Sequence, residues 1–130
     1  MITSLWIALG GAIGSMARYW TGVAAGRMWG TDFPWGTLLI NVVGSCIIGF
    51  IATVTLPQGP LPASDNMRAL MMAGFCGGFT TFSAFSLQSW DLLRAGDWQG
   101  AVWNVVASVV LCLLAVIAGH AMAMRFYALR

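Results

Sequence analysis

Four apolar stretches, each about as long as a membrane-spanning helix, fill almost the whole chain. A helix needs roughly 20 consecutive apolar residues to cross the hydrocarbon core of a bilayer. The stretches cover residues 2–25, 37–56, 67–93 and 98–124. Lipid cannot satisfy backbone polar groups, so helices are the expected form of each stretch. The sequence predicts an all-α integral membrane protein, a single domain of residues 1–130 with four transmembrane helices.

Short connections rich in turn-forming residues separate the four stretches. Residues 31–36 contain proline and glycine, residues 57–62 contain three prolines, and residues 94–97 form a tight turn. Proline cannot continue a helix, because it lacks the backbone N–H and clashes with the preceding turn. Ser64 and Asp65 offer N-caps for the third helix. These connections are too short to contain a second domain.

The composition argues against several classes of function. Hydrophobic residues make up 59% of the chain and charged residues only 8%, with no lysine and no glutamate. The scattered arginines do not form the basic stripe that nucleic-acid binding requires. The three cysteines lie in apolar stretches without a CxxC or Cys–His cluster, so a zinc site is not expected. Neither a Ser–His–Asp nor a paired-carboxylate pattern is present, so we expect no enzyme.

The arginines are balanced between the two sides of the membrane. With four spans, one side carries Arg68, Arg125 and Arg130, and the other carries Arg18, Arg27 and Arg94. Orientation by the positive-inside rule needs an asymmetry in such charges. We therefore expect insertion in both orientations and antiparallel pairing of two copies. A single orientation fixed by other features is the alternative.

Small residues four apart favour tight helix packing. The pairs are Gly10–Gly14, Gly22–Gly26 and Ser45–Gly49. Such pairs let two helix backbones approach closely in a membrane. Four short helices can hardly enclose a pore alone, which again favours an oligomer.

The third apolar stretch contains a helix-weakening segment, residues 74–86. Gly77 and Gly78 each weaken a helix by roughly 1 kcal/mol. The following threonines and serines bring polar atoms that lipid cannot satisfy. We expect the third helix to break at mid-membrane. A break at this depth is typical of a segment that lines a cavity or an ion site.

Polar side chains recur every four residues in the second and fourth stretches, and so share one helical face. The two sets are Thr37, Asn41 and Ser45, and Asn104, Ser108 and Cys112. Polar groups within a membrane usually face protein or a water path. Two alternatives stay open: the hydroxyls bond to carbonyls of their own helix, or Asn41 makes a helix–helix hydrogen bond.

Phe79, Phe82 and Phe85 follow one another at a spacing of three, which places them on one face of a continuous helix. The positive edges of aromatic rings can coordinate an anion weakly, and conduction needs weak sites. Simple packing is the alternative for these rings. Arg18 lies within the first stretch and either reaches the interface or supplies positive potential at a vestibule.

Three segments together resemble the Fluc (CrcB) family of fluoride channels. They are Gly-Gly-Phe-Thr-Thr-Phe-Ser-Ala-Phe at residues 77–85, Gly-Thr-Leu-Leu-Ile-Asn-Val-Val-Gly at residues 36–44, and Gly-Gly-Ala-Ile-Gly-Ser-Met-Ala-Arg at residues 10–18. The resemblance extends over all four stretches in order. It implies an antiparallel homodimer with two fluoride pores, which exports fluoride passively across the cytoplasmic membrane and confers fluoride resistance.

The resemblance also implies roles for single residues. Phe82 and Phe85 match pore-lining rings, and Asn41 matches a pore asparagine. The remaining pathway residues it implies are Thr37 and Ser83 of a hydroxyl track and Ser108 of the fourth helix. The carbonyls of Gly77 and Thr80 match those that hold a structural sodium ion at the dimer axis, and Arg18 matches the first-helix arginine. Ala84 replaces the family's usual threonine, so one hydroxyl of the track is missing.

Two other classes of protein fit four apolar helices. A small dual-topology multidrug transporter would need an intramembrane carboxylate, and this chain has no glutamate and no aspartate in mid-span. A structural membrane protein without transport would gain nothing from the paired glycines Gly77 and Gly78.

The arginine balance predicts that the C-terminus lies on both sides of the membrane. Cysteine-accessibility labelling of the C-terminus in cells should therefore modify some copies from outside and the rest only after permeabilisation. Labelling from one side alone would contradict dual topology.

Overall fold

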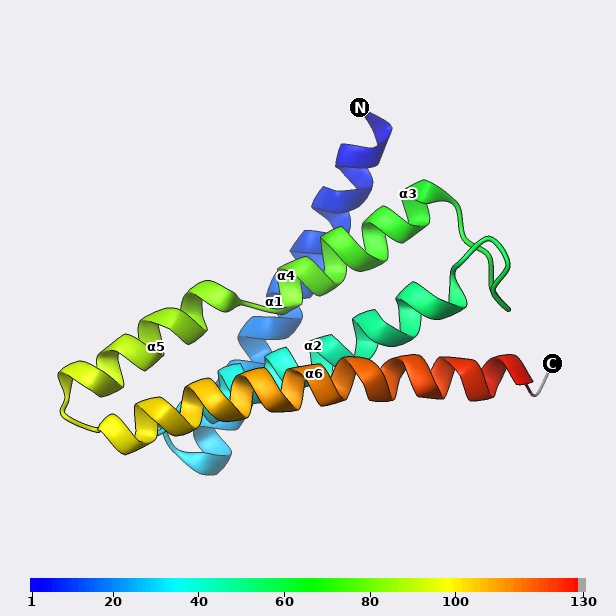
Figure 1. Ribbon diagram of the computed structural model, residues 1–130. Coiled ribbons are helices and arrows are strands. Elements are labelled where there is room, and N and C mark those ends of the chain that lie inside the picture. Colours follow the sequence, from blue (N-terminus) through cyan, green and yellow to red (C-terminus); the bar gives the residue numbers. More distant parts are fainter. Residues whose placement is uncertain (129–130) are drawn as a thin grey trace.

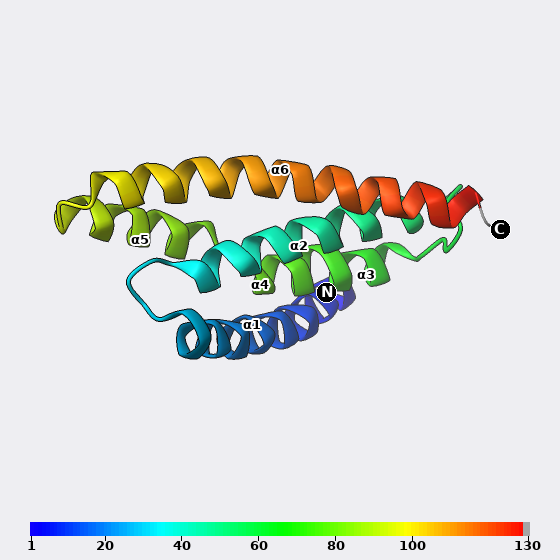
Figure 2. The ribbon, with the colours of Figure 1, turned by 90° about the horizontal axis from the view of Figure 1, so that it is seen from below.

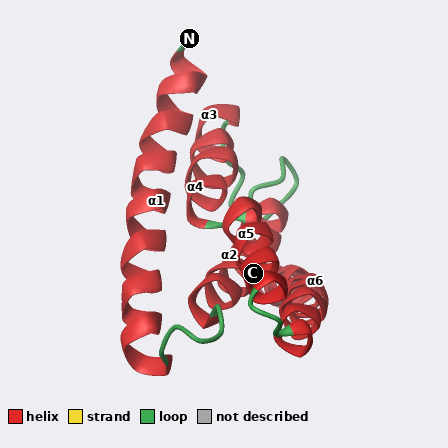
Figure 3. Cartoon of the chain, turned by 90° about the vertical axis from the view of Figure 1, so that its left-hand side faces the viewer, coloured by secondary structure: helices red, strands yellow, loops and turns green. Residues whose placement is uncertain are grey.

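The computed structural model describes residues 1–128, so Arg130 lies outside the described part. All regular secondary structure among the described residues is helical (Figures 1 and 3). The elements are α1 (Ile2–Trp29), α2 (Trp35–Val54), α3 (Asp65–Arg68), the π-helical η1 (Ala69–Cys76), α4 (Gly77–Phe79), α5 (Phe82–Arg94) and α6 (Trp98–Ala128). The expectation of an all-helical chain is therefore confirmed.

Three segments of the described chain are helical, long and apolar enough to cross a membrane. They are Trp35–Val54, Asp65–Arg94 and Trp98–Ala128, of which the second comprises α3, η1, α4 and α5. The first expected span forms a helix of 28 residues but is not in this set. Its 28 residues include two arginines, Arg18 and Arg27.

The helical path between Asp65 and Arg94 is interrupted at two threonines. α4 ends at Phe79 and α5 begins at Phe82, and the intervening Thr80 and Thr81 have extended backbones with ψ angles of 160° and 113°. Figure 1 shows this thin link between α4 and α5. The weak point predicted at Gly77 and Gly78 is instead helical, so the interruption lies a few residues later than the glycines indicated.

Gly78 serves helix packing rather than the interruption, whereas a Cβ atom added to Gly77 would meet nothing closer than the carbonyl oxygen of Met72 at 3.8 Å. A Cβ atom added to Gly78 would lie 2.6 Å from the carbonyl oxygen of Gly11 in α1. A Cβ atom on Gly14 would lie 2.9 Å from the backbone nitrogen of Phe79. The backbones of α1 and α4 therefore touch, and the predicted role of the Gly10–Gly14 pair in close packing is confirmed. A side chain at Gly22, in contrast, would meet open space.

Two packing layers result from this arrangement. α1 packs across η1 and α4, whereas α2 lies along α6 and α5 packs mainly on α6. Figure 2 shows α6 and α2 running side by side, with α1 on the opposite side of the molecule. A Cβ atom on Gly119 of α6 would lie 2.9 Å from the backbone nitrogen of Phe50 in α2. The second contact is therefore as close as the first.

Side-chain caps set where the helices begin. The Ser64 hydroxyl oxygen accepts a hydrogen bond from the backbone N–H of Met67 at 3.3 Å, as predicted for the start of the third stretch. The Asp97 carboxylate accepts one from the N–H of Gly100 at 2.8 Å and caps α6. The preceding turn contains Gly96 at φ 83°, a left-handed conformation that favours glycine.

Candidate functional site

The side chain of Asn41 holds the interrupted backbone between α4 and α5. Its Oδ1 accepts a hydrogen bond from the backbone N–H of Thr81 at 2.8 Å, and its Nδ2 donates one to the carbonyl oxygen of Thr81 at 3.1 Å. Asn41 projects from the middle of α2, forty positions earlier in the chain. This is the helix–helix hydrogen bonding left open as an alternative, and it uses the carboxamide oxygen and one of its two N–H groups.

The other backbone groups of the link also find partners. The Thr80 N–H donates to the carbonyl of Cys76 at 2.9 Å, and the Thr80 hydroxyl donates to the same oxygen at 2.8 Å. The Arg18 guanidinium donates from Nη1 to the carbonyl oxygen of Thr80 at 3.3 Å. Thr81 caps α5, because its hydroxyl oxygen accepts from the N–H of Ala84 at 3.2 Å. The polar backbone groups of the interruption are therefore largely satisfied by the protein itself.

Two cavities lie next to the link. The first, which we call the arginine cavity, has a volume of about 780 Å³ and lies between α1, α2 and the start of α5. The second, the phenylalanine cavity, has a volume of about 450 Å³ and lies between α2, η1, α5 and α6. Thr81 lines both cavities, so the link forms part of the wall between them.

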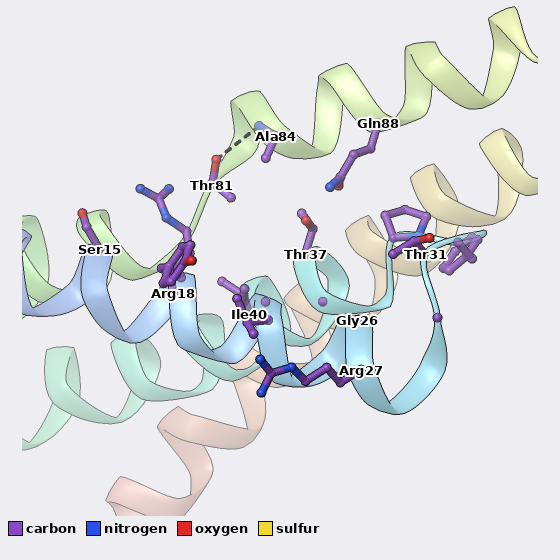
Figure 4. A pocket seen from close by; sticks show the side chains of 17 residues that line it. Ser15, Arg18, Gly26, Arg27, Thr31, Thr37, Ile40, Thr81, Ala84 and Gln88 are labelled. Atoms are coloured by element: carbon purple, nitrogen blue, oxygen red, sulfur yellow. Dashed lines mark hydrogen bonds between the residues drawn. The ribbon is translucent and has the colours of Figure 1, made fainter.

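The arginine cavity combines positive charge with neutral polar groups. Figure 4 shows Arg18, Thr37 and Gln88 around the space between α1, α2 and α5. Thr37 is buried, and Gln88 has a buried Oε1 without a hydrogen-bond partner among the described residues. Ala84 also lines this cavity. The hydroxyl of the threonine that is usual at this position in the Fluc family would therefore lie here. No pattern in the sequence indicated a role for Gln88.

The phenylalanine cavity brings together residues predicted from three different stretches. Asn41, Phe82, Phe85 and Ser108 all line it. The rings of Phe82 and Phe85 are 5.3 Å apart at an interplanar angle of 48°. Phe85 is buried, whereas Phe82 is 78% exposed. Ser108 is 7% exposed, and its hydroxyl has no hydrogen-bond partner among the described residues.

The predicted stripe of three phenylalanines does not form. Phe79 lies in α4, where it is buried and stacks on Phe75 with ring centroids 5.9 Å apart. The spacing of three assumed a continuous helix, and the extended link removes Phe79 from the face that carries Phe82 and Phe85.

Ser83 and Asn104 also differ from the simplest interpretation of the sequence. Ser83 is exposed and lines neither cavity, and its hydroxyl lies 3.2 Å from that of Thr81. Asn104 donates from Nδ2 to the Ser89 hydroxyl at 2.9 Å, and Ser89 donates to the carbonyl of Phe85 at 2.8 Å. This buried relay ties α6 to the turn that carries Phe85. Sequence reasoning missed it, because the spacing within α6 says nothing about α5.

The chemistry of the two cavities suits a small anion better than a cation or a proton. None of the residues that line either cavity in the described chain is an aspartate, glutamate or histidine. The side chains offered are two guanidinium groups, hydroxyls, amides, thiols and aromatic rings, and the backbones of Gly77 and Thr80 also line the phenylalanine cavity. Neutral hydrogen-bond donors attract an anion but bind it weakly enough for it to leave again.

Comparison with known proteins places these features in a family. Residues 5–120 match the model of the family described as CrcB-like protein, Camphor Resistance (CrcB). The chain is 52% identical to a protein of Opitutus terrae, with 97% of this chain and 96% of that one covered. It is 53% identical to a protein of Methylobacterium radiotolerans, with 93% and 84% covered, and 50% identical to one of Paramagnetospirillum magneticum, with 92% and 94% covered. Each of these relatives is named fluoride-specific ion channel FluC. Together with the apolar helices, these similarities identify a multi-pass membrane protein.

Replacing Asn41 with leucine should destabilise the protein measurably. Leucine has a similar size but cannot hydrogen-bond, so the N–H and carbonyl of Thr81 lose their partners. Each unsatisfied buried group costs about 1–3 kcal/mol. Thermal unfolding in detergent should show a clearly lower Tm for Asn41→Leu. Gln99→Leu, which changes an exposed amide in α6, should keep the parental Tm. Equal Tm values for both variants would mean that the hydrogen bonds between Asn41 and Thr81 do not contribute to the stability of the protein.

Proposed function

Because the chain belongs to the CrcB-like protein family, we propose that it is a fluoride-selective channel that exports fluoride passively across the cytoplasmic membrane. The curated relatives it resembles carry the name of a fluoride-specific ion channel. The observation that carries the proposal within this molecule is the phenylalanine cavity. It places an unpartnered buried hydroxyl, that of Ser108, beside two aromatic rings and the Asn41 amide.

These groups can replace part of the hydration of fluoride. A buried polar group without a partner is costly, so the Ser108 hydroxyl favours an acceptor that enters the cavity. Asn41 keeps one N–H of its carboxamide, since the Thr81 carbonyl takes the other. The positive ring edges of Phe82 and Phe85 are weaker ligands. Strong and weak donors in alternation bind an anion without trapping it.

The arginine cavity serves as the approach to this pathway. Arg18 and Arg27 line it, and positive charge in a cleft raises the local concentration of anions. Thr37 supplies a hydroxyl here, whereas Ala84 supplies none. Ser83, exposed beside Thr81, supplies its hydroxyl at the start of α5. Thr81 lines both cavities. An anion that moves from the arginine cavity to the phenylalanine cavity would therefore pass beside Thr81, whose backbone Asn41 holds.

The complete channel is an antiparallel homodimer with two pores. Phe82 is 78% exposed in the single subunit although its ring lines the phenylalanine cavity. A second copy that covers this face closes the cavity, and two-fold symmetry creates an identical cavity on the partner. The balanced arginines favour insertion in both orientations, which supplies copies for antiparallel pairing.

The sodium ligands of this proposal are the carbonyls of Gly77, the first residue of α4, and of Thr80, which follows α4. In a continuous helix the Gly77 carbonyl would accept from the N–H of Thr81, but that N–H donates to Asn41 instead. Gly77 is exposed, so its carbonyl can serve as a ligand. The Thr80 carbonyl accepts from Arg18 at 3.3 Å and keeps a second lone pair. Sodium, a hard cation that prefers oxygen ligands, would join these carbonyls from both copies.

The two rival functions have less support. A multidrug antiporter needs a carboxylate to exchange protons for cations, and the lining residues of the two described cavities include none. A purely structural protein gives no reason for an unpartnered hydroxyl beside a cavity. An ion channel is not an enzyme, and the family places this chain among proteins of that kind.

Two substitutions test the pathway in liposomes that hold purified protein. Phe82→Ile keeps bulk and removes the ring edge, and Asn41→Asp places a carboxylate in a low-dielectric path, where it repels an anion strongly. We expect each variant to lower fluoride efflux by at least about tenfold, with the dimer intact in Phe82→Ile. Asn41→Asp also loses the Nδ2 donor to the Thr81 carbonyl, so its Tm is measured beside its efflux to separate charge repulsion from loss of the fold. A fluoride electrode measures the efflux, and chloride efflux from the parent should be far slower.

Phe50→Ile is the matched control, because Phe50 pairs with Phe126 and lines neither cavity. It should conduct like the parent. Parental efflux from both Phe82→Ile and Asn41→Asp would mean that the rings only pack and that the assigned pathway is wrong.

The sodium proposal predicts that stability depends on sodium rather than on salt alone. A ligand that binds only the folded dimer raises its stability with concentration. The Tm of the detergent-solubilised dimer should therefore rise with sodium and stay low in N-methyl-D-glucamine at the same ionic strength. Identical Tm values and identical dimer fractions by light scattering in the two cations would refute the site.

A further inference from the structure

We propose that the phenylalanine cavity also holds a site for a soft, thiophilic metal cation, formed by the sulfur atoms of Cys76, Cys112 and Met72. The metal blocks the pathway when it binds. The blocking role rests on the proposed fluoride function, whereas the binding site itself does not. Neither the family nor the resemblance assigns a role to these three residues.

Two separate helices, η1 and α6, contribute three sulfur-bearing side chains to the wall of one cavity. Met72 and Cys76 lie four residues apart in η1, and Cys112 lies in the middle of α6. All three line the same cavity of about 450 Å³. Cys76 is 2% exposed, so its thiol is enclosed by protein and cavity. Cys76 and Cys112 are both free thiols.

The backbone at Cys76 is well anchored. Its carbonyl oxygen accepts two hydrogen bonds from Thr80, one from the N–H at 2.9 Å and one from the hydroxyl at 2.8 Å. A ligand held on an anchored backbone loses less conformational freedom when it binds a metal. Cys112 follows Ser108 by one turn on the same face of α6, and both residues line the cavity.

The ligand chemistry selects a soft cation. Thiolate and thioether sulfur prefer soft ions such as Cu(I), whereas carboxylates and carbonyls prefer hard ions. No carboxylate or imidazole lines the described phenylalanine cavity. With Hg²⁺ as the probe, each of the two thiols forms an S–Hg bond and releases its proton to water. No electrons are transferred, and the resulting bis-thiolate complex is neutral. A neutral complex avoids the large cost of burying a charge.

Binding at this position occludes the proposed fluoride pathway. The cavity is shared with Phe82, Phe85 and Ser108, whose groups the anion needs. Cys46 provides an internal comparison, because it lies on α2 and lines neither this cavity nor the arginine cavity. The structure thus separates two cavity thiols from a third thiol in the same chain.

The test uses the full chain purified and reconstituted in liposomes, with Hg²⁺ added at increasing concentration. Fluoride efflux should fall as Hg²⁺ rises and recover with dithiothreitol. Thiol titration of the same samples should show the loss of two reactive thiols for each Hg²⁺ bound, with Cys46 still reactive. Cys76→Ser and Cys112→Ser should each weaken Hg²⁺ binding and block by more than about tenfold, the loss that follows removal of even an outer partner of a metal ligand. Cys46→Ser should behave like the parent.

Unchanged Hg²⁺ block and unchanged binding in both Cys76→Ser and Cys112→Ser would overturn the site, as would loss of block in Cys46→Ser. Disappearance of two thiols without bound metal would indicate a disulfide and would also overturn it. If Cys76→Ser fails to fold, Cys112→Ser and Met72→Leu decide the question. Absent fluoride efflux before any metal is added would refute the proposed function, while metal stoichiometry and thiol titration would still report on the site.

Discussion

The pair of hydrogen bonds between the Asn41 carboxamide and the backbone of Thr81 is the interaction on which the rest of the structure depends. An extended residue within an apolar segment exposes an N–H and a carbonyl that lipid cannot satisfy. Asn41 satisfies both groups at once, at 2.8 and 3.1 Å. Arg18 adds a partner for the carbonyl of Thr80. Without these donors and acceptors, an uninterrupted helix would have the lower free energy.

The interruption in turn lets one segment pack against two different neighbours. η1 and α4 lie against α1 through the glycine contacts, whereas α5 lies against α6. A straight helix from Asp65 to Arg94 would lose either the contact with α1 or the contact with α6. The change of direction at Thr80 and Thr81 opens space on both sides of the link, where the arginine and phenylalanine cavities lie. The polar groups that these cavities need come from α1, α2 and α6.

Spacing along a single helix predicted which polar side chains of α2 and α6 share a face, while their role in an anion pathway stays a prediction. A period of four places Thr37 and Asn41 on one face of α2 and Ser108 on the polar face of α6. Thr37 lines the arginine cavity, and Asn41 and Ser108 line the phenylalanine cavity. The same reasoning failed for Phe79, because it assumed that the helix continued through Thr80 and Thr81. It also placed the weak point at Gly77 and Gly78, although both residues are helical and Gly78 makes room for α1. Glycine both weakens a helix and lets two helices pack closely. The sequence alone therefore does not show which of these two roles a glycine has.

The sequence by itself determined the helical class, the apolar stretches, the cap at Ser64, the turn at residues 94–97, and the set of polar residues within the apolar stretches. Hydrophobic length, turn chemistry and helical period are local properties, so they can be inferred from neighbours along the chain. Only the tertiary structure decided that Asn41 binds the backbone of Thr81, that the Ser108 hydroxyl finds no partner among the described residues, and that Cys76 and Cys112 share a cavity. Such contacts depend on where two distant helices cross, and the crossing is set by packing of the whole bundle rather than by any one segment.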